Sequence, residues 1–388
     1  MKKIVILPLF TMESGHHRSS DALMDSIKKL DPAVQCEKVD FLSYVNPAFE
    51  KSIAQLYLNW ITKVPHLYHT FYQNYFHRKS TILHSVYETL FLEKMEQMLE
   101  NKQPDLIICT HSFPSFLVSK LKEYGACDIP VINLYTDFFI NHLWGRKHID
   151  QHFVPSRDAK EQLIHDGVPE ENILITGIVT NDIFLKRKKK KWEQTKHHVL
   201  IAGGSLGLGN QLLSIIESAD SSQMKYRVLC GSNVQLYKRI ASMNSNSIKP
   251  LSYITSPEQM NQLYNWADAL ITKPGGVTVS EALKKKLPIF IHSILPGQEE
   301  MNMNFLEPRG LAQRLNPARP LEEQLLSVLN NPVALVQINM AMNDYLNELR
   351  LKKSGETAGH IYHMVLNQAP DRHIQYIDQL FSQLYHSL

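Results

Sequence analysis

The chain has 388 residues, of which 44% are hydrophobic and 20% are charged, and its formal net charge is +3. This length predicts two domains, since a single core stops growing near about 250 to 300 residues, and the composition excludes an intrinsically disordered chain. So small a net charge gives no support for a nucleic-acid partner, and we expect none.

The four cysteines (Cys36, Cys109, Cys127 and Cys230) are scattered and form neither a CxxC pair nor a zinc-binding pattern, which favours a reducing compartment. Residues 1–12 begin like a signal peptide, but the apolar run is short, contains Pro8 and has no small-residue cleavage site. No apolar run reaches the roughly 18 residues of a membrane span. We therefore expect a cytoplasmic protein that associates peripherally with the cell membrane.

Short β-branched segments alternate with longer amphipathic ones, a pattern typical of a doubly wound α/β domain. In the first half, strands are expected at residues 3–9, 36–40, 106–110, 131–135, 152–154 and 173–175. The pattern then starts again, with strands expected at residues 199–202, 226–230, 248–251, 269–272 and 288–292. Two similar halves predict two Rossmann-like domains that face each other across a cleft.

The expected boundaries place the first domain at residues 1–185, a basic linker at 186–196 and the second domain at 197–350. Helices are expected at residues 346–351, 359–366 and 374–388, so that 351–388 pack back on the first domain. The linker contains the run K-R-K-K-K-K at 186–191, which is either a solvated connection or a contact for anionic lipids.

Residues 269–281 have the pattern of a buried strand, a glycine turn and the start of a helix. Gly275 and Gly276 would present backbone N–H groups to an anion, and Glu281 would accept hydrogen bonds from two ribose hydroxyls. The alternative interpretation is an ordinary helix start.

Two more segments suggest ligand contacts in the second half. Gly204 and Ser205 lie in a glycine-rich turn after the strand at 199–202, which indicates either a diphosphate site or a flexible loop. Gln298, Glu299 and Asn302 offer the donors and acceptors that sugar hydroxyls need, although a polar helix cap would explain Glu299 and Glu300 in a first turn equally well.

Near the N-terminus, His16 and His17 follow the first strand closely, so one of them should lie at the carboxyl end of the sheet. Histidine is the side chain best suited to removing a proton near neutral pH. Because the chain has 18 histidines, a surface role is the alternative.

Residues 41–79 contain many aromatic side chains followed by Arg78 and Lys79. Aromatic rings beside cations suit a bilayer interface, so we predict a membrane-association segment here. A helical pair buried on the first domain is the alternative. The aromatic residues are Phe41, Tyr44, Phe49, Tyr57, Trp60, Tyr68, Phe71, Tyr72, Tyr75 and Phe76.

Together these segments resemble glycosyltransferase family 28, and within it the group of processive diacylglycerol glucosyltransferases and monogalactosyldiacylglycerol synthases. The likeness extends from residue 3 to about 329. It is carried by Gly15, His16, Ser19 and Ala22, by residues 103–108, by Thr136, Asp137, Phe138 and Trp144, by residues 176–178, 203–205, 271–281 and 296–299, and by Asn302 and Asn304.

The resemblance implies the GT-B fold, an acceptor-binding first domain and a second domain that binds a UDP-sugar, with UDP-glucose the expected donor. His16 would be the general base, with Asp137 on the opposite wall of the cleft. The implied donor contacts are Gly204 and Ser205 with the diphosphate, Tyr253 and Ile254 with uracil, Glu281 with ribose, Gln298 and Glu299 with the hexose, and Gly275, Gly276, Thr278 and Asn302 elsewhere on the UDP-sugar.

The family inverts the anomeric centre, so the resemblance implies one displacement onto a lipid hydroxyl such as that of diacylglycerol. The chain has no Asp-x-Asp motif, and we therefore expect no metal and no other cofactor. Relatives carry a further glycine just before Gly15, where this chain has Glu13 and Ser14, which leaves the acceptor open. A polyprenyl-linked or small-molecule acceptor, a UDP-N-acetylglucosamine 2-epimerase lacking its usual Gly-Thr-Arg-Pro-Glu signature, and a non-catalytic UDP-sugar sensor are the alternatives.

Overall fold

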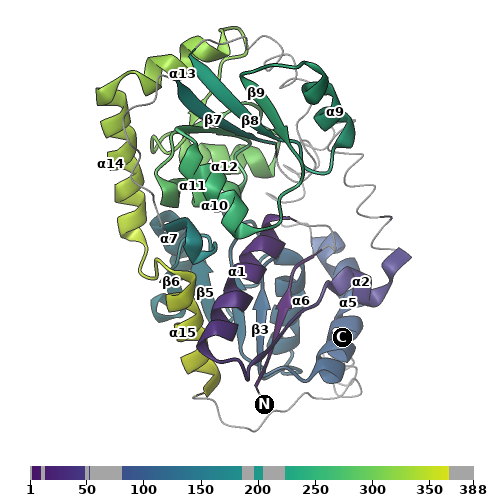
Figure 1. Cartoon of the computed structure of the whole chain (residues 1–388). Coiled ribbons are helices and arrows are strands. Elements are labelled where there is room, and N and C mark those ends of the chain that lie inside the picture. Colours follow the sequence, from purple (N-terminus) through teal and green to yellow (C-terminus); the bar gives the residue numbers. More distant parts are fainter. Residues whose placement is uncertain are drawn as a thin grey trace. The chain divides into compact units, whose positions relative to one another are not determined.

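The computed structural model describes residues 2–9, 14–48, 52, 81–185, 196–203 and 223–366. The chain divides into two compact units, of which unit 1 comprises Met1–Thr180 and Glu348–Leu388, and unit 2 comprises Asn181–Asn347. Each unit contains one six-stranded sheet in which every pairing is parallel (Figure 1). The prediction of an α/β fold with two parallel sheets is confirmed.

The sheet of unit 1 has the order β2-β1-β3-β4-β5-β6. All six strands expected in the first half are present, but β1 ends at Leu7 because Pro8 has no N–H to donate to a neighbouring strand. The strands are β1 (Lys3–Leu7), β2 (Gln35–Lys38), β3 (Leu106–Cys109), β4 (Val131–Leu134), β5 (Gln151–Val154) and β6 (Ile173–Ile175). The helices are α1 (Gly15–Leu30), α2 (Phe41–Val45), α5 (Thr81–Lys102), α6 (Ser112–Glu123), α7 (Arg157–His165) and α15 (Ser354–Leu366), with a 3₁₀ turn η1 at Glu170–Asn172.

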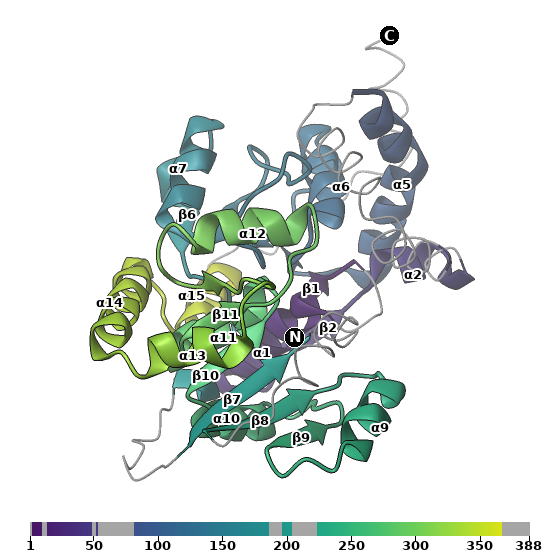
Figure 2. The ribbon, with the colours of Figure 1, turned by 90° about the horizontal axis from the view of Figure 1, so that it is seen from above.

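Both faces of this sheet are buried at its centre, which explains the continuous apolar runs of β1 and β3. Val5 and Leu7 of β1 belong to the core on one face, whereas Ile4 and Ile6 belong to the core on the other, as the two-residue period of a strand requires. Helices α5 and α6 cover one face and lie side by side in Figure 2.

Helix α15 packs along α1 within unit 1 (Figure 1). The Ser26 and Ser354 hydroxyls lie 2.6 Å apart, and the Tyr362 hydroxyl donates to Asp31 Oδ2 over 2.9 Å. The chain therefore returns to the first unit at its C-terminal end. The expected helix at residues 346–351 is confirmed only for residues 346–348, because α14 (Pro332–Glu348) ends there and residues 349–353 are not helical. Residues 374–388 lie outside the described part of the chain.

The first residues of the segment 41–79 pack on unit 1. Phe41 is fully buried, and its ring centroid lies 6.1 Å from that of Phe91 in α5, so this side chain belongs to the core and not to a membrane surface. Tyr44 is exposed, and its hydroxyl accepts a hydrogen bond from Asn101. The other aromatic residues of the segment lie outside the described residues.

The sheet of unit 2 has the order β12-β11-β10-β7-β8-β9. Pro250 lies within β9, where a missing N–H is tolerated because β9 is an edge strand. The strands are β7 (His197–Ala202), β8 (Met224–Leu229), β9 (Ile248–Leu251), β10 (Ala269–Thr272), β11 (Ile289–Ile291) and β12 (Gln313–Arg314). The helices are η2 (Asp182–Leu185), α9 (Val234–Ser242), α10 (Pro257–Trp266), α11 (Gly276–Lys285), α12 (Gln298–Leu306), α13 (Leu321–Leu329) and α14.

Within the described ranges, no single helix has both the length and the apolar character needed to cross a membrane. The bent pair α13 and α14, whose axes differ by 80°, satisfies these criteria jointly, on length and composition only.

Candidate functional site

His16 lies in the first turn of α1, which starts after the N-cap residue Ser14. Its Nδ1 atom lies 2.8 Å from the carbonyl oxygen of Thr110 and 2.7 Å from the hydroxyl of Thr136. Thr110 follows β3 and Thr136 follows β4 closely, so three chain segments meet at the carboxyl end of the sheet in unit 1. His17 instead contacts the Ser14 hydroxyl, which leaves His16 as the histidine held at the sheet.

These contacts define the tautomer of His16. A carbonyl oxygen can only accept a hydrogen bond, so we assign the ring proton to Nδ1, which donates to Thr110. The Thr136 hydroxyl donates weakly to the same carbonyl over 3.4 Å. Its oxygen is then able to accept from Nδ1–H of His16, which agrees with a proton on Nδ1. The lone pair is then on Nε2, the position from which a histidine held through Nδ1 acts as a base.

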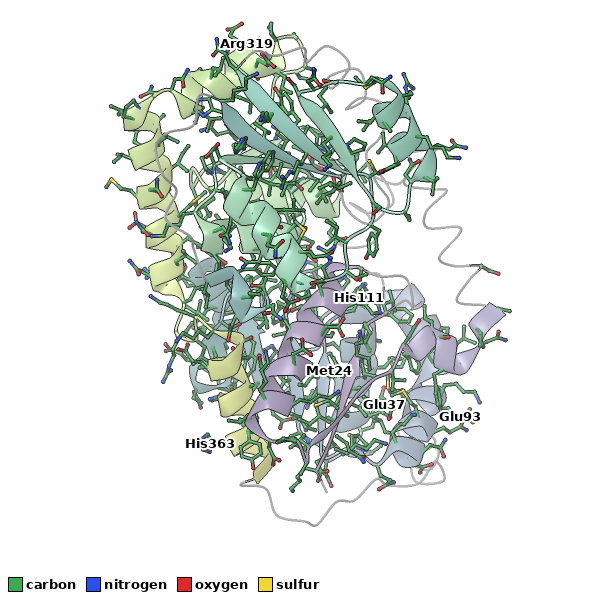
Figure 3. All side chains as sticks on the ribbon, viewed as in Figure 1. Met24, Glu37, Glu93, His111, Arg319 and His363 are labelled. Atoms are coloured by element: carbon green, nitrogen blue, oxygen red, sulfur yellow. The ribbon has the colours of Figure 1, made fainter. Side chains whose placement is uncertain are left out.

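A second histidine, His111, lies beside His16. The ring centroids are 5.1 Å apart and the rings meet edge to face. His111 is labelled in Figure 3. His111 caps α6, with Nδ1 accepting from the backbone N–H of Phe113 over 3.1 Å. Burial, together with the neighbouring His16, lowers the pKa of His111 well below its usual value, so it stays neutral. His111 was not predicted from the sequence, although it follows a buried strand just as His16 does.

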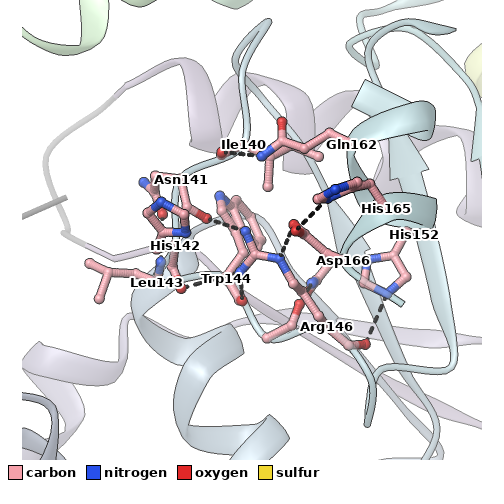
Figure 4. A network of polar contacts seen from close by, with 12 residues as sticks. Ile140, Asn141, His142, Leu143, Trp144, Arg146, His152, Gln162, His165 and Asp166 are labelled. Carbon is pink, nitrogen blue, oxygen red and sulfur yellow. Dashed lines mark hydrogen bonds and ion pairs between the residues drawn. The ribbon is translucent and has the colours of Figure 1, made fainter. Parts of the chain in front are cut away.

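Asp137 directly follows Thr136 and is half-buried, so it belongs to the same end of unit 1 as His16. The loop after it is held by Arg146, whose guanidinium donates to the carbonyls of Asn141, His142 and Trp144 and pairs with Asp166 at 2.8 Å (Figure 4). An arginine that binds three carbonyls fixes the path of the loop and so positions its residues.

Buried side chains also hold the loop that contains Arg146. His152 Nε2 donates to the carbonyl of Arg146 over 3.1 Å, and its Nδ1 accepts from the Tyr135 hydroxyl over 2.9 Å. Burial lowers the pKa of His152 to about 4, so this ring is neutral. Gly145 has no room for a side chain, because an added Cβ would lie 2.5 Å from Cβ of Ser119. The end of unit 1 that holds His16 is thus rigidly built.

In unit 2 the predicted glycine turn opens α11. Gly275 is the N-cap, has no capping side chain, and uses its own N–H to bond the carbonyl of Lys273 over 2.8 Å. Gly276, Val277 and Thr278 form the first turn of α11. The backbone N–H groups of a first turn have no carbonyl partner within their own helix. In the part of the chain that the structure describes, an added Cβ on Gly275 would meet no atom within 4 Å, so these residues leave space beside the turn. This arrangement suits an anion.

Glu281 lies further along α11 and is buried, with 4% of its surface exposed. The Tyr264 hydroxyl donates to Glu281 Oε2 over 2.7 Å, which fixes the carboxylate. Lys284, on the next turn, is buried as well, and burial lowers its pKa to about 8 against the opposing effect of Asp182 and Glu281. Tyr264 was not predictable as a partner of Glu281, because it lies on another helix, α10.

The third predicted segment starts α12 after Gly297, whose φ of 92° is in the region that favours glycine. Glu299 Oε2 accepts from the backbone N–H of Leu295 over 2.7 Å, and Oε1 lies 3.8 Å from Nζ of Lys273. The helix-cap interpretation fits Glu300, whose Oε2 accepts from the backbone N–H of the N-cap residue Gly297 over 3.5 Å, whereas Glu299 binds a residue that precedes the helix. Burial raises the pKa of Glu299, and the positive charge of Lys273 partly opposes this rise. Gln298 is half-buried and Asn302 is buried on the same helix.

The remaining predicted donor contacts lie after β9 and in the glycine-rich segment after β7. Tyr253 and Ile254 follow β9 and are half-buried. Gly204 and Ser205, like the basic run at 186–191, lie outside the described residues. Among the residues that are described, no three His, Cys, Asp or Glu side chains come together as metal ligands, and metal independence stays a prediction.

Residues 16–180 match a family model described as monogalactosyldiacylglycerol (MGDG) synthase. The chain is 38% identical over 365 residues to YkoN, an uncharacterized glycosyltransferase of Bacillus subtilis (strain 168), which covers 91% of this chain and 95% of that protein. The chain belongs to glycosyltransferase family 28. This family 28 enzyme is also 28% identical over 377 residues, or 93% of each chain, to a processive diacylglycerol beta-glucosyltransferase of Bacillus cereus (strain B4264).

Solved structures with low identity show the fold of the family 28 enzyme. MurG of Acinetobacter baumannii matches with a TM-score of 0.59 at 13% identity, over 95% of this chain and all of that one (100%). S. aureus MnaA, in a co-structure with UDP, matches with a TM-score of 0.57 at 14% identity, over 96% and 99%. The GT-B prediction is confirmed. Epimerases share this fold, so it is the sequence relatives that identify the chain as a glycosyltransferase.

Proposed function

We propose that this enzyme transfers a hexose, with glucose as the expected sugar, from a UDP-sugar to a hydroxyl of a lipid such as diacylglycerol, with inversion. The observation that carries the proposal is His16, whose Nδ1 is held by Thr110 and Thr136. A histidine fixed in this way keeps Nε2 ready to accept a proton. The names of the relatives, a diacylglycerol glucosyltransferase and an MGDG synthase, support a lipid acceptor.

The proposed reaction is a single displacement. Nε2 of His16 takes the proton of the acceptor hydroxyl as its oxygen forms a bond to the anomeric carbon. The bond from that carbon to the β-phosphate oxygen breaks, and its electron pair leaves with UDP. General base catalysis of this kind contributes about 10²- to 10⁴-fold in rate.

Unit 2 would hold the donor. The diphosphate would lie against the first turn of α11, at Gly275, Gly276 and Thr278, where fixed N–H groups stabilise the charge that develops on UDP. Glu281 would bind the ribose. The other proposed contacts are those of Gly204 and Ser205 with the diphosphate, Tyr253 and Ile254 with uracil, and Gln298, Glu299 and Asn302 with the hexose. This scheme needs no metal.

The lipid acceptor requires the enzyme to reach a bilayer from the cytoplasm. The aromatic and basic residues of segment 41–79, apart from the buried Phe41, and the basic run at 186–191 are the proposed membrane contacts. Vesicle co-sedimentation tests this: binding that increases with anionic lipid supports it, and equal recovery with and without vesicles contradicts it.

The activity is tested by measuring UDP release from UDP-glucose, UDP-galactose and UDP-N-acetylglucosamine. Each donor is combined with diacylglycerol vesicles, a polyprenyl phosphate or a small alcohol. The proposal predicts release that depends on diacylglycerol and is fastest with UDP-glucose. Release only with another acceptor would replace the lipid assignment, and no acceptor-dependent release would favour the epimerase or the sensor.

A further inference from the structure

His292 is a buried histidine that none of the assignments above uses. It directly follows β11, at the carboxyl end of the sheet in unit 2, and its backbone N–H donates to the carbonyl of Thr272 over 3.2 Å. The residue is only 9% exposed, and neither of its ring nitrogens has a hydrogen-bond partner among the described residues. The backbone of His292 is thus held by a hydrogen bond, whereas its imidazole nitrogens have unsatisfied hydrogen-bonding capacity.

His292 lies next to Lys273, a residue that contacts the proposed donor site. Strands β10 and β11 pair Thr272 with Ile291, so Lys273 and His292 are the next residues along these adjacent strands. Lys273 in turn lies 3.8 Å from the carboxylate of Glu299 at the start of α12. Burial, and then the charge of Lys273, lower the pKa of His292 to about 4, so its ring is neutral near pH 7.

The unsatisfied ring is energetically unfavourable. A buried polar group without a partner costs about 1–3 kcal/mol, and native proteins contain few of them. The ring nitrogens are closed to solvent, so bulk water does not satisfy them in this conformation. An apolar side chain of the same shape would avoid this cost, and buried polar groups that break this rule are typical of functional sites.

We propose that His292 binds hydroxyl groups of the donor hexose and so determines which hexose the enzyme accepts; this inference rests on the proposed function. A neutral imidazole has one N–H donor and one acceptor nitrogen. Sugar hydroxyls provide partners for both, whereas diphosphate oxygens only accept and would leave one nitrogen unsatisfied. Because the ring is enclosed, the side chains around it shift when the sugar enters.

The test compares two ligands on the same variant. His292→Phe keeps the shape of the ring but removes both nitrogens. Calorimetry should show that UDP binds within about twofold of the unaltered enzyme, whereas UDP-glucose loses about tenfold in affinity, the equivalent of 1.4 kcal/mol. The preference among UDP-glucose, UDP-galactose and UDP-N-acetylglucosamine should change. His292→Gln, which keeps a donor and an acceptor, should restore part of the affinity.

Thermal unfolding separates this role from a structural one. His292→Phe should unfold at the same or a higher temperature, because an unsatisfied polar group is removed, while His363→Phe on the exposed face of α15 serves as the matched control. Equal loss of UDP and UDP-glucose affinity, or no change in either, would overturn the inference alone. Absence of UDP-sugar binding by the unaltered enzyme would overturn the proposed function and, with it, this inference.

Discussion

Replacing Tyr264 by phenylalanine tests how the proposed ribose ligand is held. Tyr264 and Glu281 are 1% and 4% exposed, and the only change in Tyr264→Phe is loss of the hydroxyl that donates to Glu281 Oε2 over 2.7 Å. A hydrogen bond to a charged group contributes about 1.5–3 kcal/mol, and an enclosed carboxylate cannot readily replace it with water. We therefore expect the free energy of unfolding to fall by about 2 kcal/mol.

Affinity for UDP should fall as well, because Glu281 loses the contact that fixes its orientation. We expect a loss of about threefold to tenfold for Tyr264→Phe, or up to 1.4 kcal/mol, and a greater loss for Glu281→Ala, which removes the carboxylate itself. In the double variant the effect of Tyr264→Phe on UDP binding should disappear, since the hydroxyl then has no carboxylate to position.

Urea unfolding and calorimetry with UDP measure the two effects, with Tyr237→Phe on the exposed face of α9 as the matched control. Unchanged stability in Tyr264→Phe would show that this hydrogen bond contributes nothing. Unchanged UDP affinity in Glu281→Ala would refute the ribose assignment, whatever the stability.

Three further predictions concern two residues of unit 1 and the expected independence from metal ions. Thr136→Val removes the hydroxyl beside Nδ1 of His16 and should lower kcat about fivefold, the equivalent of about 1 kcal/mol, with UDP affinity unchanged; an unaltered kcat would show that Thr136 does not position the base. Burial lowers the pKa of His152 from 6.5 to about 4. Between these values the unfolded chain binds a proton that the folded protein does not, so stability should fall by up to about 3 kcal/mol as the pH drops from about 6.5 to about 4. Urea unfolding of His152→Gln should show a shallower pH dependence, and an identical slope would contradict the assignment. A chelator should leave the rate of UDP release unchanged, and its abolition would refute metal independence.

Strands were the most predictable part of this fold, because central strands such as β3 and β10 are buried on both faces and are therefore short apolar runs. The failures have local causes. Pro8 ends β1 early, and β12 consists only of Gln313 and Arg314, which carry no apolar signal. The end of α14 at Glu348 was also missed, since apolar residues such as Leu349 and Leu351 continue past it along the sequence.

The candidate site was predictable where a segment carries its own chemistry, as with His16 after β1 or Glu281 after the glycine turn. The residues that position those groups were not predictable. Tyr264 reaches Glu281 from another helix, and Thr136 reaches His16 from another strand, so their pairing depends on tertiary packing. The partnerless state of His292 is likewise visible only once burial and hydrogen bonds are known.

Phe41 shows the limit of reading function from composition. In sequence it belongs to a run of aromatic and basic residues suited to a bilayer, yet its ring packs against Phe91 in the core of unit 1. Aromatic side chains contribute equally well to cores and to membrane interfaces, and only burial separates the two roles.

The role of His16 as the base is tested most directly by the initial rate of UDP release from UDP-glucose in the presence of diacylglycerol vesicles, for the unaltered enzyme and for His16→Ala. Removal of the base should lower the rate by about 10²- to 10⁴-fold while UDP affinity stays unchanged. Full turnover by His16→Ala would contradict the proposed mechanism.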